Sequence, residues 1–148
     1  MVPNGHTVLM DVIPITLFIN MYLVSALRRI LGLSYNRVAF WWFAYFAAGI
    51  GAQYLLPADT LNGTIMYIPT FITLVLLTLA VKARDAQLGG VFLKALGVWA
   101  VSLAFRTVDL EICEQFPYGT HFLWHALNAW VLWRLLTALI GHAASRGR

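Results

Sequence analysis

The stretch TIMYIPTFITLVLLTLAV, residues 64–81, decides the fold class, because it is apolar along its whole length and carries no charged side chain. A helix needs roughly 20 mostly apolar residues to cross the hydrocarbon core of a bilayer, and this stretch is close to that length. Similar stretches lie on both sides of it. The sequence therefore predicts an all-α integral membrane protein with spans at residues 11–31, 38–56, 64–81, 90–108 and 120–140.

The composition of the whole chain indicates the same class of protein. Of its 148 residues, 61% are hydrophobic and only 11% are charged, and the mean hydropathy is +0.76. A water-soluble domain of this length has too small an interior to bury so much apolar surface, so lipid must be the solvent for most of it. The net charge of +4 does not indicate nucleic acid binding, because the basic residues are scattered along the chain.

The connections between the predicted spans define the architecture and the orientation. They are short and rich in turn-forming residues, so we expect one domain, residues 1–148, built as an antiparallel bundle of five helices. Arg and Lys gather at the first and third connections and at the C-terminus, whereas acidic residues gather at the second and fourth. The positive-inside rule then predicts an N-terminus outside the cell or in a lumen and a cytoplasmic C-terminus.

This orientation brings chemically active residues from distant parts of the sequence to one membrane face. An ionisable side chain is costly at membrane depth, so such residues usually persist because they have a function. The residues expected at this face are His6, Asp11, Arg106, Asp109, His121 and His125.

The two histidines of the last span suggest a metal site. His121 and His125 lie four residues apart, so on a helix their rings share one face about 6 Å apart along the axis. Imidazole is a good zinc ligand, and a catalytic zinc usually has three protein ligands and one water. Asp11 would then be the general base, and His6 is a candidate third ligand. Alternatively, His121 is an interfacial side chain and His125 hydrogen-bonds a neighbouring helix.

The remaining candidates also have structural interpretations. Asp11 opens a predicted helix with Pro14 in its first turn, which fits an N-cap. Arg106 and Asp109 lie three residues apart and fit an ion pair that offsets a costly buried charge, the role we prefer for them. Cys113 is expected to pack as a small residue and cannot form an intrachain disulfide, because the chain has a single cysteine.

Three segments resemble the alkaline ceramidase family, a group within a superfamily of seven-helix membrane hydrolases and receptors. RTVDLEIC at 106–113 and GTHFLWH at 119–125 are similar to the D-x-x-x-C and G-x-H-x-x-W-H elements of that family's last two helices. DVIPI at 11–15 is similar to the D-x-x-P-M/I opening of its third helix. The resemblance implies that the predicted spans correspond to helices three to seven of the family fold.

The resemblance also implies an activity. It points to a zinc-dependent amidase that cleaves the N-acyl bond of ceramide or a related sphingolipid within the bilayer. His121 and His125 would be zinc ligands, Asp11 the carboxylate beside the reacting water, and the structural motif positions would be Arg106, Asp109 and Cys113.

One family element has no counterpart. The family carries S-x-x-x-H on its second helix, with the histidine eleven residues before the Asp, but only ten residues precede Asp11 and His6 stands five before it. We therefore expect a chain that lacks the first two helices at its N-terminus. The alternative is a non-catalytic multi-pass membrane protein, receptor-like or degenerate, of the same superfamily. A proton-coupled transporter using Asp11 and His125 is disfavoured, because the predicted spans carry few polar residues at their centres.

Overall fold

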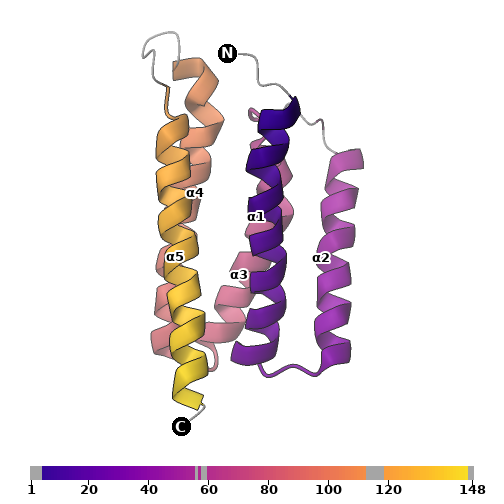
Figure 1. Ribbon diagram of the computed structural model, residues 1–148, viewed down its shortest axis with the longest axis vertical. Coiled ribbons are helices and arrows are strands. Elements are labelled where there is room, and N and C mark those ends of the chain that lie inside the picture. The colour runs from indigo at the N-terminus through magenta and orange to yellow at the C-terminus, as the bar shows by residue number, and fades with distance from the viewer. Residues whose placement is uncertain (1–4, 56, 58–59, 113–118, 147–148) are drawn as a thin grey trace.

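The computed structural model describes residues 5–55, 57, 60–112 and 119–146, with side chains for these except at 5–12, 110 and 146. All regular secondary structure in this part of the chain is helical (Figure 1). A π-helical segment, η1, continues the first α-helix, and a 3-10 segment, η2, precedes the third. The elements are α1 (Gly5–Ser25), η1 (Ala26–Ile30), α2 (Tyr35–Leu55), η2 (Thr64–Tyr67), α3 (Ile68–Lys82), α4 (Ala86–Ile112) and α5 (His121–Arg146).

Four helical segments within the described residues are long and apolar enough to cross a membrane: Ile13–Ile30, Thr64–Lys82, Ala86–Asp109 and His121–Ser145. Their mean hydropathies range from 1.2 to 2.1, and only 22% to 33% of each is buried inside the bundle. Most of the surface of each segment therefore faces outward, where an apolar side chain is stable only against lipid. The prediction of a multi-pass helical membrane bundle is confirmed at this level.

Helix α2 does not reach the hydropathy of the other four, although it has 21 residues. Its sequence is rich in Trp, Tyr and Gly, which score low on a hydropathy scale even where they face lipid. Of its residues, all of them described, only Val38 is buried. Helix α2 is therefore the most loosely packed helix of the bundle, and its membrane crossing stays a prediction.

The helices extend beyond the apolar windows from which they were predicted. Helix α1 begins at Gly5, so Asp11 lies in its second turn, and the interpretation of Asp11 as an N-cap is wrong. Helices α4 and α5 continue to Ile112 and Arg146, past the predicted ends. Hydropathy locates the part of a helix that lies in lipid, whereas the hydrogen-bonded backbone continues until a turn residue stops it.

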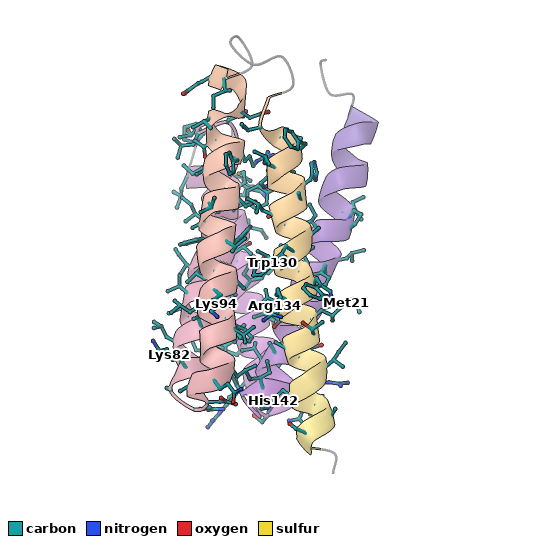
Figure 2. All side chains as sticks on the ribbon, turned by 90° about the vertical axis from the view of Figure 1, so that its left-hand side faces the viewer. Met21, Lys82, Lys94, Trp130, Arg134 and His142 are labelled. Atoms are coloured by element: carbon teal, nitrogen blue, oxygen red, sulfur yellow. The ribbon has the colours of Figure 1, made fainter. Side chains whose placement is uncertain are left out.

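The chain brings three helix ends together. The N-terminal end of α1, the C-terminal end of α4 and the N-terminal end of α5 lie at the same end of the bundle, the upper end in Figure 1. Helices α4 and α5 pack side by side, and at the lower end α5 contacts η1. The phenol of Tyr22 donates a hydrogen bond to the carbonyl oxygen of Leu135 at 3.1 Å, which ties the last turn of α1 to the middle of α5. Lys82, Lys94 and His142 all lie in the lower half (Figure 2).

The α3–α4 hairpin depends on a glycine. Asp85 caps α4 by accepting a hydrogen bond from the Leu88 amide at 2.9 Å. One turn into α4, Gly89 packs against the backbone of Lys82, and a Cβ on Gly89 would lie 2.4 Å from the Cα of Lys82. Only glycine permits this approach of the two helices, whereas a Cβ on the adjacent Gly90 meets nothing within 4 Å.

Substitution of Gly89 by alanine is therefore expected to destabilise the bundle by roughly 1–3 kcal/mol, because the added methyl group forces α3 and α4 apart. Gly90→Ala is the matched control and is expected to be neutral or stabilising, since alanine favours a helix over glycine. Thermal loss of helical circular dichroism in detergent measures both effects. Equal melting temperatures for the two variants would contradict the assigned close contact.

Candidate functional site

The carboxylate of Asp109 fixes the start of α5. Its Oδ1 accepts a hydrogen bond from the backbone N–H of Thr120 at 2.5 Å and lies 3.3 Å from the Thr120 hydroxyl. The same hydroxyl donates to the carbonyl oxygen of Phe105 at 2.7 Å. Gly119 turns the chain into α5 with a φ of 59°. A carboxylate at a helix N-terminus satisfies an unpaired backbone donor and is favoured by the helix dipole, so Asp109 holds the first turn of α5 against α4.

The second oxygen of Asp109 faces the first histidine. Its Oδ2 lies 3.7 Å from Nδ1 of His121, where the His121 side chain is 47% exposed and that of Asp109 only 12%. The ring centroid of His125 lies 4.8 Å from that of His121, and the buried indole of Trp124 packs against both rings at centroid distances of 5.0 Å and 4.3 Å. The structure therefore brings Asp109 of α4 beside His121 and His125 on the first turns of α5, and Trp124 packs against both histidine rings.

This donor set fits part of a zinc site. Two imidazoles bound to one tetrahedral zinc, with Zn–N distances of about 2.0–2.1 Å, have ring centroids roughly 5 Å apart, close to the separation found here. A carboxylate at Nδ1 is the usual outer partner of a histidine that binds metal through Nε2. Among the described side chains, no group of three or more His, Cys, Asp or Glu could hold a metal ion. His121 and His125 could supply at most two ligands to such an ion, and a third would have to come from outside the described side chains.

Two of the predicted site residues belong to α1. His6 lies in the first turn of α1 and Asp11 in the second, so both lie on the helix end that shares the upper end of the bundle with α5 (Figure 1). Their side chains lie outside the described part of the structure, as does Cys113. The roles predicted for these three residues therefore stay predictions.

Arg106 does not form the predicted ion pair with Asp109. Among the described side chains, the guanidinium of Arg106 instead lies over the rings of Trp124 and Tyr67, with Cζ 4.7 Å and 5.4 Å from the two centroids. The Asp109 carboxylate instead accepts a hydrogen bond from the Thr120 N–H at the start of α5. A spacing of three residues put Arg106 and Asp109 on one face of α4, but it gave no information on the partners that neighbouring helices offer.

Several residues that shape the site were not identified from the sequence. Thr120 and Trp124 link α4 to α5, and Tyr67 on η2 packs edge-on against Trp124 with centroids 6.2 Å apart. Asn62 donates a hydrogen bond to the carbonyl oxygen of Arg106 at 3.0 Å. Thr120 stands directly before His121 and after a glycine, which is a recognisable helix-start signal. Tyr67 and Asn62 carry no comparable signal, because their contact with α4 depends on how α3 packs.

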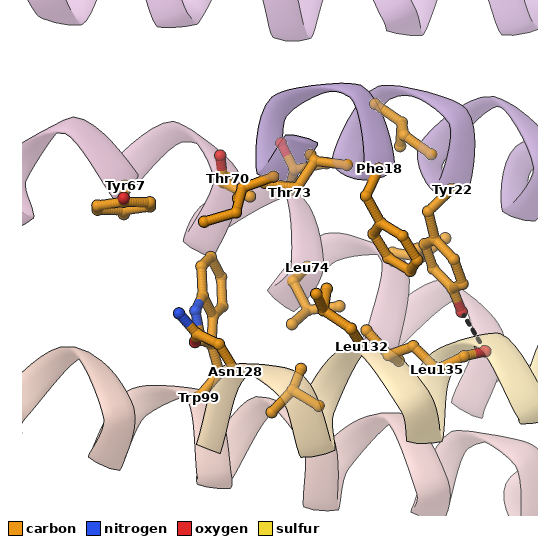
Figure 3. A pocket seen from close by; sticks show the side chains of 15 residues that line it. Phe18, Tyr22, Tyr67, Thr70, Thr73, Leu74, Trp99, Asn128, Leu132 and Leu135 are labelled. Carbon is orange, nitrogen blue, oxygen red and sulfur yellow. Dashed lines mark hydrogen bonds between the residues drawn. The ribbon is translucent and has the colours of Figure 1, made fainter. Parts of the chain in front are cut away.

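An apolar groove starts one turn below His125. Asn128, three residues further along α5, forms one wall, and Tyr67, Trp99 and Tyr22 form others (Figure 3). The groove has a volume of about 90 Å³ and passes between α1, α3, α4 and α5. Ser102 anchors the polar end of this region by donating to Asn128 Oδ1 at 2.9 Å. The groove therefore begins about one helical turn along α5 from the histidine pair, and neither histidine lines it.

Compared with family models, with curated proteins and with solved structures, the chain shows no significant match. The similarity to alkaline ceramidases therefore rests on the three quoted segments.

Replacing Asp109 by alanine is expected to loosen the first turn of α5, because the Thr120 amide loses its acceptor at a cost of about 1–2 kcal/mol. Hydrogen exchange of the peptide containing residues 119–125 is expected to accelerate roughly 5- to 30-fold, as that free energy dictates. Asp109→Asn keeps an acceptor oxygen, so its hydrogen exchange at residues 119–125 is expected to accelerate less than in Asp109→Ala. The exposed Glu111 of the same turn gives the control, Glu111→Ala, and equal exchange in Asp109→Ala and Glu111→Ala would contradict the capping role.

Proposed function

We propose that the protein is a ceramidase-like, zinc-dependent membrane hydrolase that cleaves the N-acyl amide bond of ceramide or a related lipid. The observation that carries this proposal is that Asp109, His121 and His125 lie together where α4 meets the start of α5, about one helical turn from an apolar groove. A metal-ligand pair backed by a carboxylate suits amide hydrolysis, and the adjoining groove suits a lipid chain. The resemblance of segments 11–15, 106–113 and 119–125 to alkaline ceramidases supports the same activity.

The third zinc ligand is assigned to His6. It lies in the first turn of α1 and therefore at the upper end of the bundle, where the other two ligands lie. Three histidines and one water would complete the coordination usual for a catalytic zinc.

The residues of the site would divide the reaction between them. A zinc ion held there would polarise the amide carbonyl and supply an acidified water molecule at neutral pH. Asp109 would keep the proton of His121 on Nδ1, so that Nε2 faces the metal. Asp11 would accept a proton from the attacking water and pass it to the amide nitrogen as the C–N bond breaks, which gives a free fatty acid and an amine.

The groove would hold the acyl chain during this reaction. Its walls are mainly aliphatic and aromatic, and its 90 Å³ accommodates part of a chain, while the remainder of the lipid extends into the bilayer. Asn128, which lines the groove and accepts a hydrogen bond from buried Ser102, would be the polar side chain nearest to a substrate amide.

The site would lie at the outer or lumenal membrane face. We propose that α2 is the fifth span and that the N-terminus is outside. The distribution of charge supports this orientation, because Lys82 and Lys94 lie in the lower half of the bundle (Figure 2), whereas α5 begins at the upper end (Figure 1). Basic residues favour the cytoplasmic side of a membrane protein.

The decisive experiment measures zinc content by mass spectrometry and fatty acid release from a fluorescent ceramide, using the purified chain in detergent. The wild type is expected to bind about one zinc per chain, as a three-histidine site does. His121→Ala, His125→Ala and His6→Ala are each expected to lose zinc and hydrolysis while the helical circular dichroism stays near the wild-type signal. His142→Ala, which removes a histidine at the far end of the same helix, is the control and is expected to retain both.

Three outcomes would contradict parts of this proposal. A folded wild-type chain without zinc or hydrolysis would favour the non-catalytic membrane protein. Zinc retained undiminished in His6→Ala would rule out His6 as a ligand. Full turnover in His125→Ala would remove that ring from the site.

A further inference from the structure

A second and larger cavity lies on the other side of α1 from α5. It has a volume of about 480 Å³ and is lined by α1, α2, η2 and the start of α3, together with Arg106 from α4. This volume falls within the range of about 300–1,000 Å³ that is usual for small-molecule sites. It contains neither His121 nor His125, so its occupant is not determined by the metal site.

The polar side chains in the deeper part of this cavity satisfy one another. The indole N–H of Trp42 donates to Asn20 Oδ1 at 2.8 Å, and the Asn20 amide donates to the carbonyl oxygen of Thr16 at 2.8 Å. The hydroxyls of Tyr45 and Thr70 are hydrogen-bonded at 3.0 Å. With these groups paired, the deeper walls offer a ligand mainly the apolar surface of side chains such as Ile15, Ile19, Phe46, Ile50 and Met66.

Arg106 is different, because its positive charge has no acceptor among the described residues. Its Nε–H is buried and makes no hydrogen bond there, and its guanidinium contacts only the faces of Tyr67 and Trp124. The indole Nε1–H of Trp124 in the same stack is likewise buried without an acceptor in the described part of the chain, and Trp124 is 0% exposed. Buried N–H donors are nearly always paired. Arg106 is the member of this stack with a charged donor group that also lines the cavity, so it is the group that a bound acceptor would meet.

The chemistry of that acceptor follows from the guanidinium. It offers parallel N–H groups that match the two oxygens of a carboxylate, and it carries a single positive charge that one monoanion would balance. Arg106 lies three residues before Asp109, the last residue of an apolar span, so the charge sits near the membrane surface. From Gln53 to Tyr45 the cavity follows eight residues of α2, which is about 12 Å along the helix axis.

We propose that this cavity binds a free fatty acid, with its carboxylate on Arg106 and its hydrocarbon chain directed between α1 and α2 towards the membrane centre. A single chain fits a cavity of this size, whereas a two-chain phospholipid would have to leave one chain outside. The charged end at the interface and the apolar end in the bilayer match the orientation that such an amphiphile already has in a membrane. Loosely packed α2 provides the route of entry.

The test uses the purified full-length chain in nonionic detergent and a stearic acid that carries bromine in mid-chain. Bromine quenches nearby tryptophan fluorescence, and Trp42 lies beside the cavity through its hydrogen bond to Asn20. The brominated acid is expected to quench in a saturable manner, whereas its methyl ester, which lacks the charge, shows only the linear quenching of detergent partitioning. An excess of phosphatidylglycerol, a two-chain monoanionic lipid, is expected not to displace the acid.

Two kinds of variant distinguish the contribution of the Arg106 charge to fatty acid binding from the contribution of the cavity volume. Arg106→Gln is expected to weaken binding roughly 10-fold or more, the loss of a charged hydrogen-bond pair, and Arg106→Lys to weaken it less. Gly49→Leu fills the cavity from α2 without touching Arg106, because a Cβ on Gly49 meets nothing within 4 Å, and it is expected to abolish the saturable component. Gly51→Leu is its control: Gly51 has the same open surroundings but does not line the cavity.

The proposal would be overturned by unchanged binding in both Arg106→Gln and Gly49→Leu, by equal saturable binding of the methyl ester, or by displacement with phosphatidylglycerol. None of these readouts requires zinc or hydrolysis. Failure of this proposal is therefore distinguishable from failure of the proposed amidase activity.

Discussion

The carboxylate of Asp109 is the interaction on which the upper end of the bundle depends. One carboxylate oxygen accepts a hydrogen bond from the Thr120 N–H at the start of α5, and the other faces the ring of His121. The first N–H groups of a helix have no partner within that helix, and Asp109 on the neighbouring α4 supplies an acceptor for one of them at the start of α5. The same contact that satisfies α5 thus also sets the position of His121, and folding and the candidate chemistry share a single side chain.

Sequence reasoning recovered the features that depend on local pattern. The apolar stretches predicted the helical membrane class, and the turn residues located all the connections between helices. The spacing of His121 and His125 predicted that their rings lie together, and the structure places the centroids 4.8 Å apart. These features depend on periodicity and composition, which are present in the sequence itself. Helix ends were placed less well, since hydropathy does not register the turns that extend beyond lipid.

Features that depend on contacts between distant segments were not recoverable. Arg106 was predicted to pair with Asp109, but the faces of Tyr67 and Trp124 surround it instead. Nothing in the sequence places η2 beside the end of α4, so Tyr67 could not be recognised as a partner of Arg106. Asp11 was also interpreted as an N-cap, but α1 begins at Gly5, so Asp11 lies inside the helix.

Tyr67 lies between the two cavities and belongs to the wall of each. Arg106 stacks on its ring from α4, and Trp124 meets it from α5. A ligand that displaces the Tyr67 ring would increase the volume of the cavity it occupies and decrease the volume of the other cavity. Ligands in the two cavities would then compete. Thermodynamic reciprocity requires each ligand to lower the binding affinity of the other by the same factor.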